Sequence, residues 1–265
     1  MKTVLVTGAS SGIGETLARK FSQRGYHVVL VARSTDKLTA LAQQLESTTG
    51  NKVTVQTADL SRTGAAEKLA VALKNLDVEI DILINCAGVL EHGSFVDMTP
   101  AMHKGVIDLN ISGLTEMLSY FLPPMIARGH GRVLNVASIA AFQPIPSLAT
   151  YAATKAYVLS LTESLAEELT NTGVTITALC PGITATNMLT TAKEKEDGLN
   201  IPSFIIGDAD DVAEQGYNAC LKGDVICVPG SINLAATLAG RATPKWLLRK
   251  VTGFMGRYAL GKNKS

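Results

Sequence analysis

The sequence has no excess of charge of either sign, no paired cysteine motif and no long apolar run. Its 24 Lys and Arg residues against 23 Asp and Glu residues give a formal net charge of +1, whereas nucleic-acid-binding proteins carry a strong basic excess. We therefore expect no nucleic-acid partner. No stretch reaches the roughly 20 apolar residues that span a bilayer, and the apolar run before Gly8 is too short for a signal peptide. These absences predict a cytoplasmic protein.

The four cysteines have no spacing that is typical of a metal site. None of them belongs to a CxxC or CxxH motif, and each stands in an apolar or strand-like setting. Buried, reduced thiols are therefore expected, and no metal is predicted. The cysteines are Cys86, Cys180, Cys220 and Cys227.

Apolar residues, in contrast, make up 46% of the 265 positions, which is enough for a large core and argues against disorder. Short β-branched or apolar runs alternate with segments of helical periodicity, a pattern typical of a parallel sheet with helices on both faces. We predict one α/β domain with about seven strands over residues 1–230, followed by a C-terminal extension, 231–265, that packs on the domain or on a partner. The predicted strands are 3–7, 28–32, 53–57, 80–85, 132–138, 174–180 and 225–228.

A glycine-rich turn lies between the first predicted strand and the first predicted helix. It reads Gly8-Ala9-Ser10-Ser11-Gly12-Ile13-Gly14. The free backbone N–H groups of such a turn, together with the positive end of the helix after it, attract a pyrophosphate. The turn therefore predicts a dinucleotide site. Its spacing is Gly-x-x-x-Gly-x-Gly rather than Gly-x-Gly-x-x-Gly, and a tight turn without a ligand is the alternative.

Arg33 follows the second predicted strand, where a dinucleotide fold meets the adenosine ribose. An acidic residue at this position accepts a hydrogen bond from the ribose 2′-OH of NAD(H), whereas an Arg suits the 2′-phosphate of NADP(H). Asp36, three residues later, fits better in the first turn of the next helix, where negative charge is favourable. We therefore predict that NADP(H) is preferred over NAD(H). An exposed Arg on a loop is the alternative.

Tyr151 and Lys155 stand four residues apart in a segment with apolar residues at helical spacing, which places both on one face of a helix. A free tyrosine, with a pKa near ~10, is a poor acid-base catalyst at neutral pH. A neighbouring cation favours the phenolate and lowers that pKa. The pair therefore predicts a proton donor and acceptor. A surface helix that happens to hold both residues is the alternative.

Together these motifs resemble the short-chain dehydrogenase/reductase family. The resemblance covers about residues 3–230, and Cys86 departs from the family pattern. It implies a Rossmann-type doubly wound parallel sheet and an oxidoreductase that interconverts a ketone or aldehyde and a secondary alcohol by hydride transfer. The motifs that carry it are Thr7–Gly14, Asn85–Gly88, Asn110, Ser138, Tyr151 with Lys155, and Pro181-Gly182 followed by Thr186.

The resemblance also implies a catalytic set of four residues. Tyr151 would exchange a proton with the substrate oxygen, and Ser138 would orient that oxygen. Lys155 would hold the nicotinamide ribose and lower the pKa of Tyr151, while Asn110 would hold a water that connects Lys155 to solvent.

The residues expected to bind the cofactor lie at or near the predicted carboxyl ends of the strands. Asp59 and Leu60 would border the adenine, and the segment from Pro181 to Thr186 would fix the nicotinamide carboxamide, Thr184 through its backbone. The full expected set is Gly8, Ser10, Ser11, Gly12, Ile13, Gly14, Arg33, Asp59, Leu60, Asn85, Ala87, Gly88, Tyr151, Lys155, Pro181, Gly182, Thr184 and Thr186.

Two of the loops expected to wall the substrate, 89–92 and 139–145, are largely apolar and offer no Lys or Arg to clamp an anion. We therefore predict an apolar or bulky ketone or alcohol as substrate. The third loop, 186–206, carries a charge run and is expected to be a mobile lid. A catalytically silent NADP(H)-binding sensor or scaffold is the alternative function. An epimerase or dehydratase is disfavoured, because little chain follows residue 186 for a separate substrate domain.

Residues 244–260 have the pattern of a basic amphipathic helix. We expect it to pack on its own domain or on a sister subunit, and peripheral contact with a membrane is the alternative. The resemblance implies a homodimer or homotetramer, in which the long helices predicted around 110–128 and 150–170 could pair across a two-fold axis.

Overall fold

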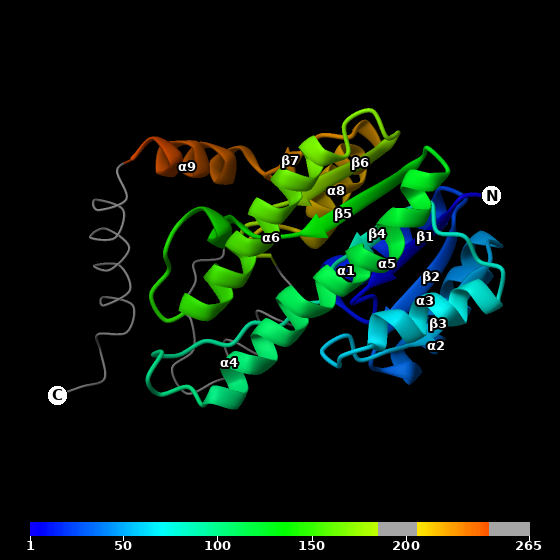
Figure 1. The fold of residues 1–265 in the computed structure, drawn as a ribbon, viewed down its shortest axis with the longest axis horizontal. Helices are drawn as coiled ribbons and strands as arrows, with labels where there is room; N and C mark the ends of the chain where they lie inside the picture. The colour runs from blue at the N-terminus through cyan, green and yellow to red at the C-terminus, as the bar shows by residue number, and fades with distance from the viewer. Residues whose placement is uncertain (185–205, 244–265) are drawn as a thin grey trace.

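Seven parallel strands form one sheet in the order β3-β2-β1-β4-β5-β6-β7 (Figure 1). The computed structural model describes residues 1–184 and 206–243. The predicted doubly wound parallel sheet is confirmed within this part of the chain, with strand ends that differ from the predicted ones by two residues at most. The strands are β1 Thr3–Thr7, β2 His27–Ala32, β3 Val53–Thr57, β4 Ile82–Asn85, β5 Gly131–Val136, β6 Val174–Leu179 and β7 Ile226–Cys227.

Helices cover both faces of the sheet, and a separate apolar core fills the space under each face. The central strands are buried on both sides, which explains why β1 reads as a continuous apolar and β-branched run rather than an alternating one. One core joins the sheet to α1 Gly12–Gln23, α2 Thr35–Thr49 and α8 Ala209–Lys222. The other joins it to α3 Ala65–Asn75, α5 Leu114–Ala127 and α6 Ala149–Glu168.

The direction of winding reverses between β1 and β4. From β1 the chain moves outward to β2 and β3, and then returns to place β4 on the other side of β1. Open α/β sheets bind their ligands outside the carboxyl ends of the strands at such a switch point. The glycine turn after β1 and the segment Cys86–Gly88 after β4 both lie there.

The segment predicted as one or two long helices over 99–128 holds two α-helices separated by a π-helical turn. The first helix is α4 Pro100–Ile107, the π turn η1 spans Asp108–Gly113, and α5 follows. A π turn carries one more residue per turn than an α-helix can hold, and such turns are frequent at functional sites. Asn110 lies inside it and is 1% exposed, so the turn directs an amide side chain inward.

The last described elements extend the fold beyond the sheet. A short 3₁₀ helix, η2 Ile139–Phe142, follows β5, and α9 Ser231–Ala242 contacts it. The predicted basic tail helix lies in residues 244–265, outside the described residues, and so does nearly all of the predicted lid. None of the helices in the described part of the chain is both long and apolar enough to cross a membrane.

Candidate active site

The glycine turn needs glycine because backbone closes in on it from two sides. Gly8 has φ 67°, and a Cβ built there would lie 2.9 Å from the amide nitrogen of Ala87. A Cβ on Gly14 would lie 2.4 Å from the carbonyl oxygen of Gly8. Gly12 begins α1 with φ 58°. The turn is thus held between the start of α1 and the segment after β4. Ser10, Ser11 and Ile13 complete it, with Ser11 at the N-cap of α1.

Thr7 fixes the segment after β4 against the glycine turn. Its Oγ1 accepts hydrogen bonds from the backbone N–H groups of Cys86 and Ala87, both at 3.0 Å, and donates to the carbonyl of Ile84 at 3.2 Å. Thr7 is 1% exposed, so these bonds are shielded from water. The sequence analysis assigned no role to this hydroxyl, although Thr7 stands in the quoted glycine motif.

Arg33 and Asp59 lie close together because β2 and β3 are neighbours in the sheet. A hydrogen bond from Ser61 is the main cause that lowers the pKa of the Asp59 carboxyl, and the positive charge of Arg33 contributes in the same direction. Arg33 itself is exposed. Asp36 stands in the first turn of α2, as predicted. Leu60 is buried, and its carbonyl oxygen abuts Gly113 of the π turn.

Tyr151 and Lys155 are both buried in the first two turns of α6, with 8% and 7% of their surfaces exposed. The Lys155 Nζ lies 5.7 Å from the centroid of the Tyr151 ring and donates a 2.8 Å hydrogen bond to the carbonyl of Val136 at the end of β5. Ser138 follows that strand, and its Oγ accepts from the N–H of Ala140 at 3.1 Å. The structure therefore brings Ser138, Tyr151 and Lys155 together.

The side chain of Asn110 extends from the π turn toward Gly88 and Lys155. Its Nδ2 donates to the carbonyl of Val89 at 2.9 Å and to the Thr154 Oγ1 at 3.1 Å, and its Oδ1 accepts from the N–H of Val89 at 2.9 Å. Gly88 lies between Asn110 and Lys155, since a Cβ added there would be 3.3 Å from the Asn110 Oδ1 and 3.6 Å from the Lys155 Nζ. Thr154, which the sequence analysis did not assign, connects Asn110 to α6.

Burial dominates the electrostatics of Tyr151 and Lys155. It raises the pKa of Tyr151 to about 12, although a hydrogen bond with Ser138 acts in the opposite direction. It also lowers the pKa of Lys155 to about 8, against opposing effects of Cys86 and Cys180. The direction for Tyr151 is opposite to the predicted one, because the desolvation of the phenolate by burial outweighs the hydrogen bond with Ser138 that favours it.

Asn85 holds two strands together in the interior of the sheet. It is 3% exposed, and its Nδ2 donates to the Oδ1 of Asn135 at 3.0 Å on the neighbouring β5. The Nδ2 of Asn135 in turn donates to Thr162 of α6 at 2.9 Å. This chain of amides aligns the ends of β4 and β5 with α6. The predicted contact of Asn85 with a cofactor stays a prediction.

Pro181, Gly182 and Thr184 follow β6, and Thr186 lies outside the described residues. The Thr184 Oγ1 donates to the carbonyl of Gly182 at 3.1 Å. A Cβ on Gly182 would lie 2.6 Å from the Nδ2 of Asn233, so the amide of α9 packs directly on this turn. Asn233 could not be predicted as a neighbour of Gly182 from the sequence, because it stands 51 positions further along the chain and belongs to none of the family motifs.

The wall beside Tyr151 is apolar. Ala140, Tyr151 and Ala152 form a small cluster, against which Leu90, Ile145 and Leu148 pack. Two contacts join the segments around this wall, one between two loops and one between α4 and α6. The N–H of Gly93 donates to the carbonyl of Ser147 at 3.0 Å, and the Nδ1 of His103 lies 2.8 Å from the hydroxyl of Thr150.

Sequence comparisons agree with this geometry. A family model described as short chain dehydrogenase matches residues 2–197. A protein of Staphylococcus epidermidis named an uncharacterised oxidoreductase is 37% identical over 187 residues, which are 71% of this chain and 80% of that protein. The chain therefore belongs to the short-chain dehydrogenase/reductase family of oxidoreductases.

Solved structures of the same fold cover nearly the whole chain. A short-chain dehydrogenase from Sphingobium yanoikuyae in complex with NADPH is 32% identical, with a TM-score of 0.82 over 96% of this chain and 95% of that one. An alcohol dehydrogenase from Comamonas testosteroni, described as specific for bulky-bulky ketones, is 27% identical, with a TM-score of 0.77 over 91% and 92% of the two chains. These neighbours support a nicotinamide cofactor and a small-molecule substrate.

Proposed function

We propose that this protein is an NADP(H)-dependent oxidoreductase that reduces an apolar ketone or aldehyde to an alcohol, with Tyr151 as the general acid and base. The observation that carries the proposal is the convergence of Ser138, Tyr151 and Lys155 at the carboxyl end of β5, with Lys155 held by the Val136 carbonyl. In this family fold the cofactor belongs at the same end of the sheet.

The residues at the switch point fit a dinucleotide. Side chains on Gly8 or Gly14 would clash with the backbone of Ala87 and of Gly8, so glycine keeps the turn tight at the start of α1, where backbone N–H groups can bind a pyrophosphate. The exposed Arg33 would bind the 2′-phosphate of NADP(H), with Asp59 and Leu60 beside the adenine. Pro181, Gly182, Thr184 and Thr186 would hold the nicotinamide end. The remaining contacts would come from Ser10, Ser11, Gly12, Ile13, Asn85, Ala87 and Gly88.

The cofactor, when bound, supplies the hydride, and the chain supplies orientation and a proton. The Ser138 hydroxyl orients the substrate oxygen, and the Tyr151 hydroxyl gives it a proton. With its pKa raised to about 12, Tyr151 holds its proton at neutral pH and can donate it, although this transfer costs more than one from a phenol whose pKa lies nearer the working pH. Lys155, with a pKa lowered to about 8, can return a proton to Tyr151. Asn110 completes the path toward solvent.

The substrate class follows from the wall of the site. Ala140, Leu90 and Ile145 surround the side of Tyr151 on which the substrate would lie, and they offer contact to hydrocarbon groups but no charge to bind an anion. The description of the Comamonas testosteroni enzyme as specific for bulky-bulky ketones supports a similar preference here. Small anionic keto acids should therefore be poor substrates.

The test is a panel of ketones, aldehydes and alcohols assayed with NADPH and with NADH. We expect turnover of apolar ketones with NADPH and a loss of roughly 10²- to 10⁴-fold in kcat for Tyr151→Phe, the range typical of a lost general acid. Tyr120→Phe, at an exposed tyrosine on α5, is the matched control and should keep wild-type activity. Arg33→Asp should weaken or reverse the preference for NADPH.

Three different assay results would contradict the roles of Arg33 and Tyr151 and the catalytic activity. Equal rates with NADPH and NADH in the wild type would refute the assignment of Arg33. Full activity of Tyr151→Phe would refute the proton transfer. Tight binding of NADPH without turnover of any compound in the panel would favour the alternative function, a cofactor-binding sensor or scaffold.

A further inference from the structure

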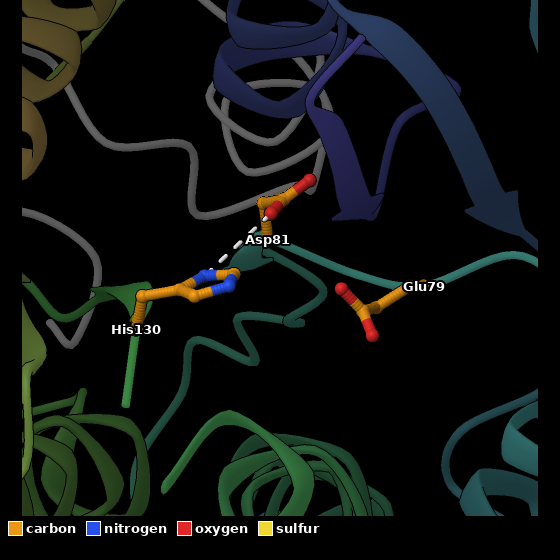
Figure 2. A group of neighbouring side chains, drawn as sticks. All are labelled: Glu79, Asp81 and His130. Atoms are coloured by element: carbon orange, nitrogen blue, oxygen red, sulfur yellow. Dashed lines mark ion pairs between the residues drawn. The ribbon is translucent and has the colours of Figure 1, made fainter. Parts of the chain in front are cut away.

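We propose that Glu79, Asp81 and His130 form a binding site for a divalent transition metal, with Zn²⁺ as the best match. Figure 2 shows the three side chains around a common space, with Glu79 and Asp81 on the segment before β4 and His130 immediately before β5. One potential ligand atom from each residue lies within 4.8 Å of the other two. Since His130 and Asp81 precede their strands, the site is at the amino ends, away from the proposed active site.

The backbone brings the three residues together. Glu79 and Asp81 lie two residues apart on the segment that leads into β4. In the ladder between β4 and β5, Ile82 is paired with Arg132. Extending that register by two residues places His130 opposite Ile80, between the two carboxylates. The three ligands therefore come from the segments that lead into two adjacent parallel strands, although 49 residues separate Asp81 from His130.

Asp81 is already held in the orientation that a metal requires. Its Oδ2 accepts a 2.7 Å hydrogen bond from the N–H of Thr3, and its own N–H donates to the carbonyl of Thr3 at 2.9 Å. Its carbonyl accepts from the N–H of Arg132 at 3.0 Å. Bonds of this kind orient the ligands of metal sites. They leave the Asp81 Oδ1 directed at His130, whose Nδ1 lies 3.8 Å away.

The contact between Asp81 and His130 is too long for a hydrogen bond, so the pair has room for an ion. Zinc binds imidazole nitrogen and carboxylate oxygen at about 2.0–2.2 Å, which separates neighbouring ligands of a tetrahedral site by about 3.4 Å. The Asp81 and His130 atoms, 3.8 Å apart, must therefore come about 0.4 Å closer, and no pair of the three, all within 4.8 Å, must close by more than about 1.4 Å. Side chains that are 67% exposed in Glu79 and 59% exposed in His130 can rotate to do so, and water would supply the fourth position.

The charges around the site favour a cation, with one competitor. The donor set is two carboxylates and one imidazole, which suits zinc better than Mg²⁺ or Ca²⁺, whose sites are built from oxygen ligands alone. The competitor is Arg128, whose Nε lies 3.7 Å from a Glu79 oxygen. Its guanidinium also donates to the carbonyl of Ile80 and is mostly buried, so it can keep that bond while Glu79 turns toward the metal.

The experiment titrates the purified full-length protein with ZnCl₂ by calorimetry and follows CoCl₂ by visible absorption. We expect one zinc per chain and weakening of at least about tenfold in both Glu79→Gln and His130→Asn. The control is Glu67→Gln, which removes the same charge from an exposed position on α3 and should bind zinc as the wild type does. MgCl₂ should give no heat attributable to this site.

A histidine-resolved NMR spectrum identifies the ligand directly. Zinc should shift the imidazole signals of His130 and leave those of His103, which faces Thr150, unchanged. Two results would overturn the proposal: no zinc binding at 100-fold excess over protein, or binding that is as tight in His130→Asn as in the wild type. The second result would assign the zinc to the thiols or to another surface group.

Discussion

Replacing the buried Lys155 with Met would test the electrostatics of the candidate site through the stability of the fold. Burial lowers the pKa of the Lys155 amine from 10.5 to about 8. Between these two pH values the unfolded chain binds a proton that the folded protein does not. Below pH 8 both states are charged, and the folded state carries the full cost of burying that charge. Above pH 10.5 neither state is charged, and the cost disappears.

The magnitude follows from the two pKa values. Their difference, 10.5 − 8, is about 2.5, and each pKa unit corresponds to about 1.36 kcal/mol, so the cost is about 3 kcal/mol. Met fills a similar volume without a charge. The free energy of unfolding of Lys155→Met, relative to wild type, should therefore fall by about 3 kcal/mol as the pH rises from 8 to 10.5. Effects of packing, which do not depend on pH, cancel in this comparison.

The assay is urea unfolding of both proteins, followed by circular dichroism at pH 7.5 and pH 10.5. Lys68→Met is the control, because Lys68 is exposed on α3 and its replacement should give the same relative stability at both pH values. A relative stability of Lys155→Met that also stays constant would refute the reasoning. It would mean that water reaches the amine in the folded protein.

Three further predictions concern contacts around the site. Gly14→Ala should weaken NADPH binding at least about tenfold, because its Cβ meets the Gly8 carbonyl at 2.4 Å, whereas Gly105→Ala, with open space around it, should bind NADPH normally. Thr7→Val should lower the free energy of unfolding by about 2 kcal/mol in urea titrations, since it leaves buried N–H groups without a partner. Asn233→Ala should raise KM for NADPH more than it changes kcat, because it removes the contact with the turn after β6.

The sheet could be predicted from the sequence because each strand is a short continuous segment in which nearly all residues are apolar or β-branched. Runs such as Val28–Ala32 are apolar throughout, which only a strand buried on both faces requires. The π turn could not be predicted, because the backbone it packs against is distant in the chain. Gly113 packs on the carbonyl of Leu60, more than 50 residues earlier in the chain, and no local pattern records that contact.

Features of the candidate site that depend on the type and position of a residue could be predicted from the sequence. Features that depend on burial or on packing in the folded protein could not. The positions of Ser138, Tyr151 and Lys155 after a strand and on a helix were predicted, and the structure brings them together. The direction of the Tyr151 pKa was wrong, because the spacing reveals a nearby cation but not the burial that outweighs it. Asn233 was missed for a related reason, since only the packing of α9 brings it to Gly182.

The π turn at Asp108–Gly113 makes the length of this segment as important as its composition. Successive residues of an α-helix are about 100° apart, so one residue fewer would let α4 continue into α5 as an ordinary helix. Such a deletion would improve the local backbone geometry and still rotate Asn110 away from Thr154, or else turn the apolar side of α5 out of the core. A deletion that restores a regular α-helix here would therefore misplace Asn110 in the candidate site. Substitutions in this segment should be tolerated far better than changes in its length.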